Sequence, residues 1–451
     1  MSNAAPIPLV TDAAAHSGLP IEGAVRAQSV QIAISPWWTL LFVTIVSAPI
    51  HLVFFGNPSF DSWRYRPYLA LVDLLVIALV ATRCLSTVRA LIADRRDLIG
   101  RALTVLFLVL AVSFALHPGS LGAATIMRLA GIVVIAHMIG RADRRHLALV
   151  VTIFVVTTAF EALVTLGQKL TGRALGLAFL GEVGSPFNPL GTHRAPVGTI
   201  FYPYPLAGMG LVAASIAIAA TVRAVVPIWV GVVGAVAGGV LVGLSFSVAG
   251  AISAMALLSV GVLALKFDRS VARRALAIGL IGFAVGLIGA GAIDYGGWAW
   301  KGARSTHGVE EASNGRMGML REATAIVKRW PLIGVGPGNF MKTRDAHPDI
   351  KAIASEPQPV HMVPLLIVVE GGIPAALALV ALGVAMVAGF RRSGWMGPMI
   401  AVSFSGFLLF DHYPWLFGIG TVTLGVWFGA MTALAQIGRG PAEQAADALP
   451  R

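Results

Sequence analysis

Two segments of the chain carry residue types and spacings on which chemistry could depend. The first begins at Arg316 and continues into a glycine-rich stretch, PLIGVGPGNF (331–340); the second, HMVPLLIVVEGG, begins at His361 and reaches Glu370 nine residues later. A guanidinium group offers a planar fork to phosphate oxygens. An imidazole has a pKa that suits a general base near neutral pH. Together the two segments indicate a site that binds an anion and moves a proton.

Each of these features also has a structural interpretation. His361 lies beside two prolines, where an interfacial histidine could simply cap a helix. The glycines Gly334, Gly336 and Gly338 either expose backbone N–H groups that cradle an anion or only let the chain reverse near a membrane surface. The stretch lacks the Lys and Ser/Thr of a P-loop, so it predicts no nucleotide site.

The elements that must position such a site belong to a membrane protein. The chain of 451 residues is 57% hydrophobic and only 12% charged, with a mean hydropathy of +0.82, whereas an average soluble domain has roughly 25% charged residues. We therefore predict an all-α integral membrane protein with about twelve transmembrane helices, because the following runs approach the length that spans a bilayer: 37–55, 67–85, 102–116, 121–140, 147–168, 205–222, 225–246, 248–267, 275–293, 363–390, 396–411 and 415–436.

Short arginine-rich loops predict the orientation of these helices. All of them face the cytoplasm if the amino terminus is inside, as the positive-inside bias demands; they are DRRD (94–97), RADRRH (141–146), DRSVARR (268–274) and RRSGW (391–395). The same threading places two long loops, 169–204 and 294–358, on the outer side. The membrane domain is then 37–436, between a loose cytoplasmic tail (1–36), which lacks the features of a signal peptide, and a second cytoplasmic tail (437–451).

The distribution of charged residues and the scarcity of cysteine indicate which classes of ligand the chain could bind. The net charge of +12 follows partly from the topological bias and implies no nucleic acid partner. Cations also remain in the outer loops, which suggests either an anionic ligand, such as a diphosphate or an acidic glycan, or contact with lipid headgroups; they are Lys169, Arg173, Arg194, Lys301, Arg304, Arg316, Arg321, Lys328, Arg329, Lys342, Arg344 and Lys351. The single cysteine, Cys84, excludes a disulfide framework and a thiolate cluster, and we predict no metal.

The spacing of apolar residues and the positions of ionisable residues predict roles for further segments. Residues 315–329 have the spacing of an amphipathic helix that the following proline ends. The glycine- and alanine-rich run VGVVGAVAGGVLVG predicts a close helix-packing face. Arg128 and Glu161 lie inside apolar runs, where ionisable groups need a partner or a wet cavity, so they either pair with each other or line a substrate path. Asp411 and His412 are interpreted as interfacial residues.

The pattern resembles the O-antigen ligase and O-antigen polymerase superfamily, membrane enzymes that act on lipid-linked polysaccharides. The resemblance covers roughly 190–380. It rests on Arg316, Pro331, Leu332, Gly334, Gly336, His361, Glu370 and Gly372, and on a second theme formed by Arg194, Gly198, Phe201, Pro203 and Ala207. Three positions depart from the family's motifs: Met362 and Tyr204 stand where the family has Asn, and Leu320 stands where it has a bulky aromatic residue.

The resemblance implies a glycan transferase of the bacterial inner membrane whose site faces the periplasm. The donor would be an undecaprenyl-diphosphate-linked glycan held by Arg194, Arg316 and Arg321, and His361 would help an acceptor hydroxyl attack with inversion, without metal or cofactor. The acceptor would be lipid A core in a ligase or another lipid-linked glycan in a polymerase, and membrane lipids would surround the enzyme. Supporting roles fall to Gly334, Gly336, Gly338, Glu370, Gly372 and Arg128.

Two other classes of protein stay open from the residues alone. A secondary transporter with twelve spans would need several ionisable residues near the membrane midplane and some broken helices, and only Arg128 and Glu161 clearly qualify. A membrane scaffold would leave the pattern from Arg316 to Gly372 unexplained. We therefore favour the ligase-like transferase, with a polymerase of O-antigen, capsule or exopolysaccharide as the closest alternative.

Overall fold

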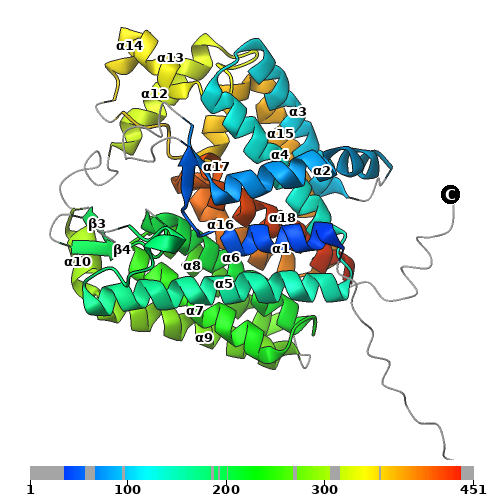
Figure 1. The fold of residues 1–451 in the computed structure, drawn as a ribbon, viewed down its shortest axis with the longest axis vertical. Coiled ribbons are helices and arrows are strands. Elements are labelled where there is room, and N and C mark those ends of the chain that lie inside the picture. The colour runs from blue at the N-terminus through cyan, green and yellow to red at the C-terminus, as the bar shows by residue number, and fades with distance from the viewer. Residues whose placement is uncertain are drawn as a thin grey trace, which may run out of the picture.

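A computed structural model describes residues 35–437, apart from 56–66, 94–96, 184–186, 191–192, 201, 268–271, 305–314 and 355–356 (Figure 1). The predictions for most of the two tails, and for Phe201, lie outside the described residues. The described part of the chain is almost entirely helical, with two small antiparallel hairpins. The prediction of an all-α integral membrane protein is confirmed.

The elements follow one another in this order: α1 (Pro36–Ser47), β1 (Val53–Phe55), β2 (Leu69–Ala70), α2 (Leu71–Ala93), α3 (Leu98–Leu116), α4 (Ser120–Gly140), α5 (Arg144–Thr171), a 3-10 turn (Ala178–Leu180), β3 (Phe187–Leu190), β4 (His193–Pro196), α6 (Pro203–Val222), α7 (Ile228–Ser245), α8 (Val248–Phe267), α9 (Ala272–Ile293), α10 (Tyr295–Arg304), α12 (Arg316–Arg329), α13 (Phe340–Ala346), α14 (Pro348–Lys351), α15 (Val363–Ser393), α16 (Met396–Phe410), α17 (Tyr413–Leu416) and α18 (Gly418–Ile437).

Ten of the helices in the described part of the chain are long and apolar enough to cross a membrane: α2 to α9, α15 and α18. Two shorter apolar helices, α1 and α16, stand where the first and eleventh runs were predicted. The number of twelve spans therefore stays a prediction. The bounds 37–55 of the first run are wrong, because α1 ends at Ser47 and residues 53–55 form strand β1. Pro49 has no N–H group with which to continue the helix.

Three helices, α4, α6 and α18, form the buried centre of the bundle, and glycines let their neighbours approach closely. A Cβ added at Gly238 in α7 would lie 2.3 Å from the carbonyl oxygen of Gly210 in α6, and one added at Gly239 would lie 2.3 Å from that of Phe283 in α9. Only glycine permits such contacts between helix backbones. The predicted packing face in the run VGVVGAVAGGVLVG is therefore confirmed.

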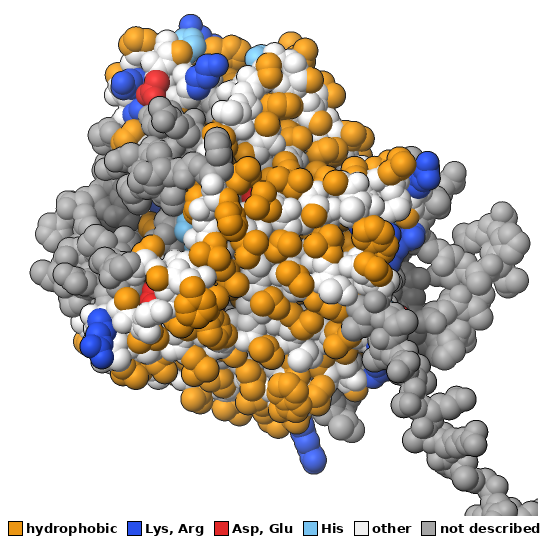
Figure 2. Space-filling model, viewed as in Figure 1, with side chains coloured by type: hydrophobic (Ala, Val, Ile, Leu, Met, Phe, Trp, Pro, Cys, Tyr) orange, Lys and Arg blue, Asp and Glu red, His pale blue; other side chains and the backbone are white. Residues whose placement is uncertain are grey.

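Apolar side chains cover the middle of the molecule, and charged ones gather at its two ends (Figure 2). One end carries both hairpins, α10, α12 to α14 and α17 (Figure 1). We call it the outer end. The second hairpin, α10 and α12 to α14 belong to the two predicted outer loops. The predicted helix at 315–329 is confirmed as α12, which starts one residue later, at Arg316. In the second hairpin, β3 pairs with β4 from Phe187 opposite Pro196 to Leu190 opposite His193.

Candidate functional site

Helix α15 is broken near its start, inside the segment that the sequence singled out. Gly372 has φ 66° and ψ −158°, values outside the helical region, and Pro374 follows two residues later. A break of this kind deprives the Ile373 N–H and the carbonyls of Val369 and Glu370 of helical partners. Such groups are costly to leave unpaired at membrane depth, so another segment must satisfy them.

The glycine turn, residues 331–339, supplies all three partners. The carbonyl of Pro331 accepts from the unpaired N–H at 2.8 Å, and the N–H groups of Val335 and Gly336 donate to the two carbonyls, each at 3.0 Å. The hydroxyl of Ser113 in α3 lies within hydrogen-bond distance of the second of these carbonyls, at 2.7 Å. The glycine turn and the broken helix therefore complete each other's backbone hydrogen bonds.

The glycines of this turn are required by backbone conformation and by close approach. Gly334, Gly336 and Gly338 have φ values of 75°, 87° and 71°, which favour glycine. A Cβ at Gly334 would lie 2.5 Å from the carbonyl carbon of Glu370. The N–H groups of Gly336 and Gly338 donate to α15, so the interpretation that they cradle an anion is wrong.

The Glu370 side chain joins the glycine turn to α17. It is 1% exposed; one carboxylate oxygen accepts from the N–H of Gly338 at 2.8 Å, and the other accepts from the indole N–H of Trp415 at 3.2 Å. Both oxygens are therefore engaged inside the protein. Glu370 is a positioning residue in this structure.

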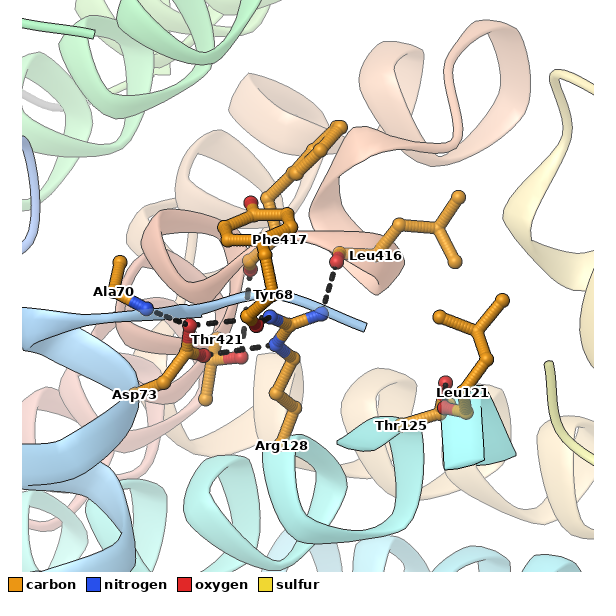
Figure 3. A network of polar contacts seen from close by, with 9 residues as sticks. All are labelled: Tyr68, Ala70, Asp73, Leu121, Thr125, Arg128, Leu416, Phe417 and Thr421. Atoms are coloured by element: carbon orange, nitrogen blue, oxygen red, sulfur yellow. Dashed lines mark hydrogen bonds and ion pairs between the residues drawn. The ribbon is translucent and has the colours of Figure 1, made fainter. Parts of the chain in front are cut away.

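A buried ion pair occupies the outer end of α4. The Arg128 guanidinium donates to both carboxylate oxygens of Asp73, at 2.9 and 3.1 Å, and also to the carbonyls of Leu416 and Tyr68 (Figure 3). Both side chains are at most 3% exposed. Asp73 in addition accepts from the N–H of Ala70 at the start of α2. Arg128 thereby connects α4 to β2, α2 and the end of α17.

Glu161 has a different partner, so the prediction that Arg128 and Glu161 could pair with each other is wrong. The Glu161 carboxylate accepts from the N–H of Thr199 at 3.0 Å and lies 2.6 Å from its hydroxyl. It is fully buried in α5. Glu161 therefore holds the end of the first long outer loop against α5, immediately before α6 begins.

A pocket lies between the ion pair and the glycine turn. Its empty volume is about 450 Å³, open solvent at the mouth included, and its walls include Tyr68, Arg128, Pro359, Glu370 and Phe417. Burial raises the pKa of the Tyr68 hydroxyl above its usual range, although the Arg128 charge opposes the shift. The two ionisable groups of the wall are already paired, so this pocket suits an apolar group rather than an anion.

Three outer segments meet beside that pocket. The His361 ring, directly before α15, contacts the His412 ring edge to face, with the ring centroids 4.3 Å apart and the planes at 84°. His412 and its neighbour Asp411 are 5% and 4% exposed, between α16 and α17. The sequence interpretation of these two as ordinary interfacial residues missed their proximity to His361. The signal was present in FDHYPW, where two ionisable residues directly follow an apolar run.

The start of α12 lies close enough to this cluster to act on it electrostatically. Burial is the main reason why the pKa of the Tyr202 hydroxyl lies well above its usual range; Tyr204 and the charge of Asp411 raise it further, and the charge of Arg316 lowers it. The Tyr202 and Tyr204 rings contact each other at 4.8 Å. Among the described residues, Arg316 has no hydrogen-bond or ion-pair partner.

The described structure does not show the other two predicted binding residues, Arg321 and Arg194, at this group. Arg321 is exposed on α12. Arg194 lies in β4 with its backbone opposite Pro189, and its side chain is outside what the structure describes. Several outer cations have carboxylate partners within 4.0 Å, which weakens the argument from their number: they are Lys169 with Asp294, Arg329 with Asp349, Arg344 with Glu322 and Asp345, and Lys351 with Asp345.

Within the described ranges, no group of three or more His, Cys, Asp or Glu side chains lies close enough to hold a metal ion. The arrangement offers the Arg316 guanidinium at the start of α12, an imidazole in contact with a second imidazole, and a buried carboxylate, Asp411. Such a group can bind an anion and accept a proton.

Comparison with known proteins found a family model that matches part of this chain. The family model described as O-antigen ligase matches residues 233–380, from α7 to the first part of α15. The matched segment contains Arg316, the glycine turn, His361 and Glu370, whereas Tyr202 and Asp411 lie outside it. None of the curated proteins compared matches the chain. The match supports the resemblance to the O-antigen ligase and polymerase superfamily, and with the apolar helices it supports a multi-pass membrane enzyme of that kind.

Proposed function

We propose that this chain, a member of the O-antigen ligase and polymerase superfamily, transfers a glycan from an undecaprenyl-diphosphate carrier to a hydroxyl of lipid A core at the periplasmic face of the inner membrane. The observation that carries the proposal is the contact of the His361 and His412 rings next to Asp411, whose charge and that of Arg316 both act on Tyr202. Both Arg316 and His361 lie in the segment that matches the family.

Arg316 is assigned to the diphosphate of the donor. When the bond between the anomeric carbon and the diphosphate oxygen breaks, that oxygen keeps the electron pair and negative charge grows on the leaving group. A guanidinium stabilises this charge more in the transition state than in the ground state.

His361 is assigned to the acceptor. The acceptor hydroxyl oxygen forms the new bond to the anomeric carbon from the side opposite the leaving group, and its proton passes to the imidazole, so the product has the inverted configuration. His412 packs edge to face on this ring and limits its rotation. Undecaprenyl diphosphate leaves intact, and cleavage of the activated bond between the anomeric carbon and the diphosphate oxygen supplies the driving force.

The two ionisable residues that favoured a transporter have structural partners. Arg128 is paired with Asp73, and Glu161 holds Thr199. A transported ion or proton would have to compete with these contacts, which are buried. Glycan transfer therefore accounts better for the polar residues of this chain.

The test is transfer by the purified full-length chain in detergent. It is mixed with undecaprenyl-diphosphate-linked glycan and, separately, with lipid A core or with further lipid-linked repeats. We expect glycosylated core with the wild type, and a fall of about 10²-fold or more with His361→Ala, the contribution typical of a general base. His146→Ala is the matched control. His146 pairs with Asp143 at the start of α5, whereas the candidate site lies at the outer end of the molecule. Longer chains without modified core would identify a polymerase, and equal rates for both variants would contradict the role of His361.

A further inference from the structure

A second pocket shares the glycine turn and α13 with the one described above, but uses different residues of both. It has an empty volume of about 760 Å³, open solvent included, and its walls include His117, Trp330, Asn339, Lys342, Thr343 and His347. His117 caps α3, and Trp330 caps α12. The function proposed above assigns no role to this pocket.

The lining of this pocket is basic. It contains an ammonium group and two imidazoles, from Lys342, His117 and His347, and no carboxylate. Lys342 is exposed and has no ion-pair partner in the part of the chain that the structure describes. The nearest acids on α13 and α14 are already engaged: Asp345 by Arg344 at 3.1 Å, and Asp349 by Arg329 at 3.3 Å. The pocket is therefore suited to an anion.

The walls of the pocket are fixed in place. Asn339, only 9% exposed, donates from its amide to the carbonyls of His117 at 2.9 Å and Val335 at 3.1 Å, so it joins the end of α3 to the glycine turn. The His347 ring lies edge-on to Trp330, with centroids 5.0 Å apart, and its Nδ1 lies 2.8 Å from the Thr343 carbonyl. An anion would thus meet groups that need little rearrangement.

Large apolar side chains flank the same pocket and point to a ligand with acyl chains. Leu116 is 55% exposed directly before His117, and Leu332 and Ile333 in the glycine turn are 71% and 41% exposed. Exposed leucines on a membrane helix face lipid, and Trp is typical of the level of the headgroups. Figure 2 shows Lys, Arg and His side chains gathered at this end of the molecule, next to the apolar band.

We propose that this pocket binds the phosphate ester of a lipid in the surrounding leaflet, with Lys342 as the main counter-charge and the acyl chains on Leu116, Leu332 and Ile333. A free phosphate ester has the same charged group but lacks the chains, so it would bind through Lys342 alone. The proposal does not depend on glycan transfer, because it is measured as binding.

The experiment uses the full-length protein in a neutral detergent and three probes: dioctanoyl phosphatidic acid, glycerol 3-phosphate and dioctanoylglycerol. We expect phosphatidic acid to bind most tightly, and Lys342→Gln to weaken that binding about tenfold, the loss typical of one charge-assisted contact. Lys328→Gln is the matched control, since Lys328 is also an exposed outer lysine but lies outside the pocket. Leu332→Ser removes an exposed side chain, so it leaves folding intact and should weaken phosphatidic acid but not glycerol 3-phosphate.

Three results would overturn the proposal. The first is phosphatidic acid binding that is absent or equal in Lys342→Gln and the wild type. The second is glycerol 3-phosphate binding as tight as that of the lipid, which would assign the pocket to a soluble phosphate. The third is dioctanoylglycerol binding as tight as phosphatidic acid, which would leave the basic lining without a role.

Discussion

Two polar regions of the outer end differ in the state of their hydrogen-bond donors. Around Arg128 and Glu370, hydrogen-bond partners inside the protein satisfy the guanidinium, the carboxylates and the backbone at the break in α15. Around Arg316, the guanidinium has no partner among the described residues. The difference teaches that an arginine inside an apolar run, such as Arg128, can stabilise the fold. An arginine at the start of a surface helix, such as Arg316, is a better candidate for binding a ligand.

The physical reason lies in burial. An unpaired charge at membrane depth is costly, so Arg128, which is 3% exposed, requires Asp73. Arg316 is half-buried at the first turn of α12 and keeps contact with water, so it can fold without a partner. Three changes in the buried region and one at an exposed ion pair test this distinction, from the largest expected effect to the smallest.

The largest effect is expected at the buried ion pair. Arg128→Met leaves the Asp73 carboxylate buried without its partner, and we expect a loss of about 3–5 kcal/mol in the free energy of unfolding. Thermal unfolding in detergent measures it. The double variant Arg128→Met with Asp73→Leu removes both charges and should recover part of the loss. A single variant as stable as the wild type would contradict the structural role of the pair.

The next effect concerns the contact between the glycine turn and α15. Gly334→Ala places a Cβ 2.5 Å from the backbone of Glu370 at a φ of 75°, so we expect a loss of about 2 kcal/mol or more from strain and overpacking. Gly383→Ala, also within α15, is the control, because nothing lies within 4 Å of its added Cβ. The control should gain about 0.5–1 kcal/mol. The same unfolding measurement compares them, and equal shifts would refute the contact.

A smaller effect is expected at Glu370. Glu370→Gln keeps the shape but replaces one acceptor oxygen with an amide group that faces a donor, either the Gly338 N–H or the Trp415 indole. We expect a loss of about 1–3 kcal/mol. Trp415→Phe removes one donor and should reduce that loss in the double variant, as a double-mutant cycle would show. Strictly additive losses would mean that Glu370 and Trp415 do not interact.

The smallest effect is expected at the surface. The pair between Arg329 and Asp349 joins side chains that are 50% and 70% exposed, so Arg329→Gln should change the stability by about 0–1 kcal/mol. Unfolding in high salt supplies the control, because screening removes what little the pair contributes. A loss as large as that of Arg128→Met would erase the distinction between buried and exposed ion pairs in this molecule.

Much of the fold could be predicted from the sequence because it depends on local patterns. The apolar runs, the amphipathic spacing of α12 and the glycine spacing of α7 each describe one helix, and each was found. Contacts between segments that are distant in the sequence could not be predicted. No local pattern shows that the Ile373 N–H binds the Pro331 carbonyl, or that Asp73 rather than Glu161 is the partner of Arg128.

Some residues of the candidate site could likewise be predicted from the sequence, and others could not. Arg316 and His361 could be predicted, because they belong to compact motifs whose residues keep fixed distances along the chain. His412 and Tyr202 could not, because they come from other outer segments that only the packing of α6 and α16 brings to His361 and Arg316. The resemblance gave Glu370 a supporting role, and in the structure its carboxylate accepts hydrogen bonds from the glycine turn and from Trp415 in α17.

The most direct test of the central claim is the affinity of the purified protein for undecaprenyl diphosphate, the leaving group in the proposed reaction. We predict that Arg316→Gln weakens this binding about tenfold or more, because it removes a charge-assisted contact to the diphosphate, while Arg321→Gln, an exposed arginine five residues further along α12, changes it little. Equal affinity in the wild type and Arg316→Gln would contradict the claim that the available arginine of this site binds the donor.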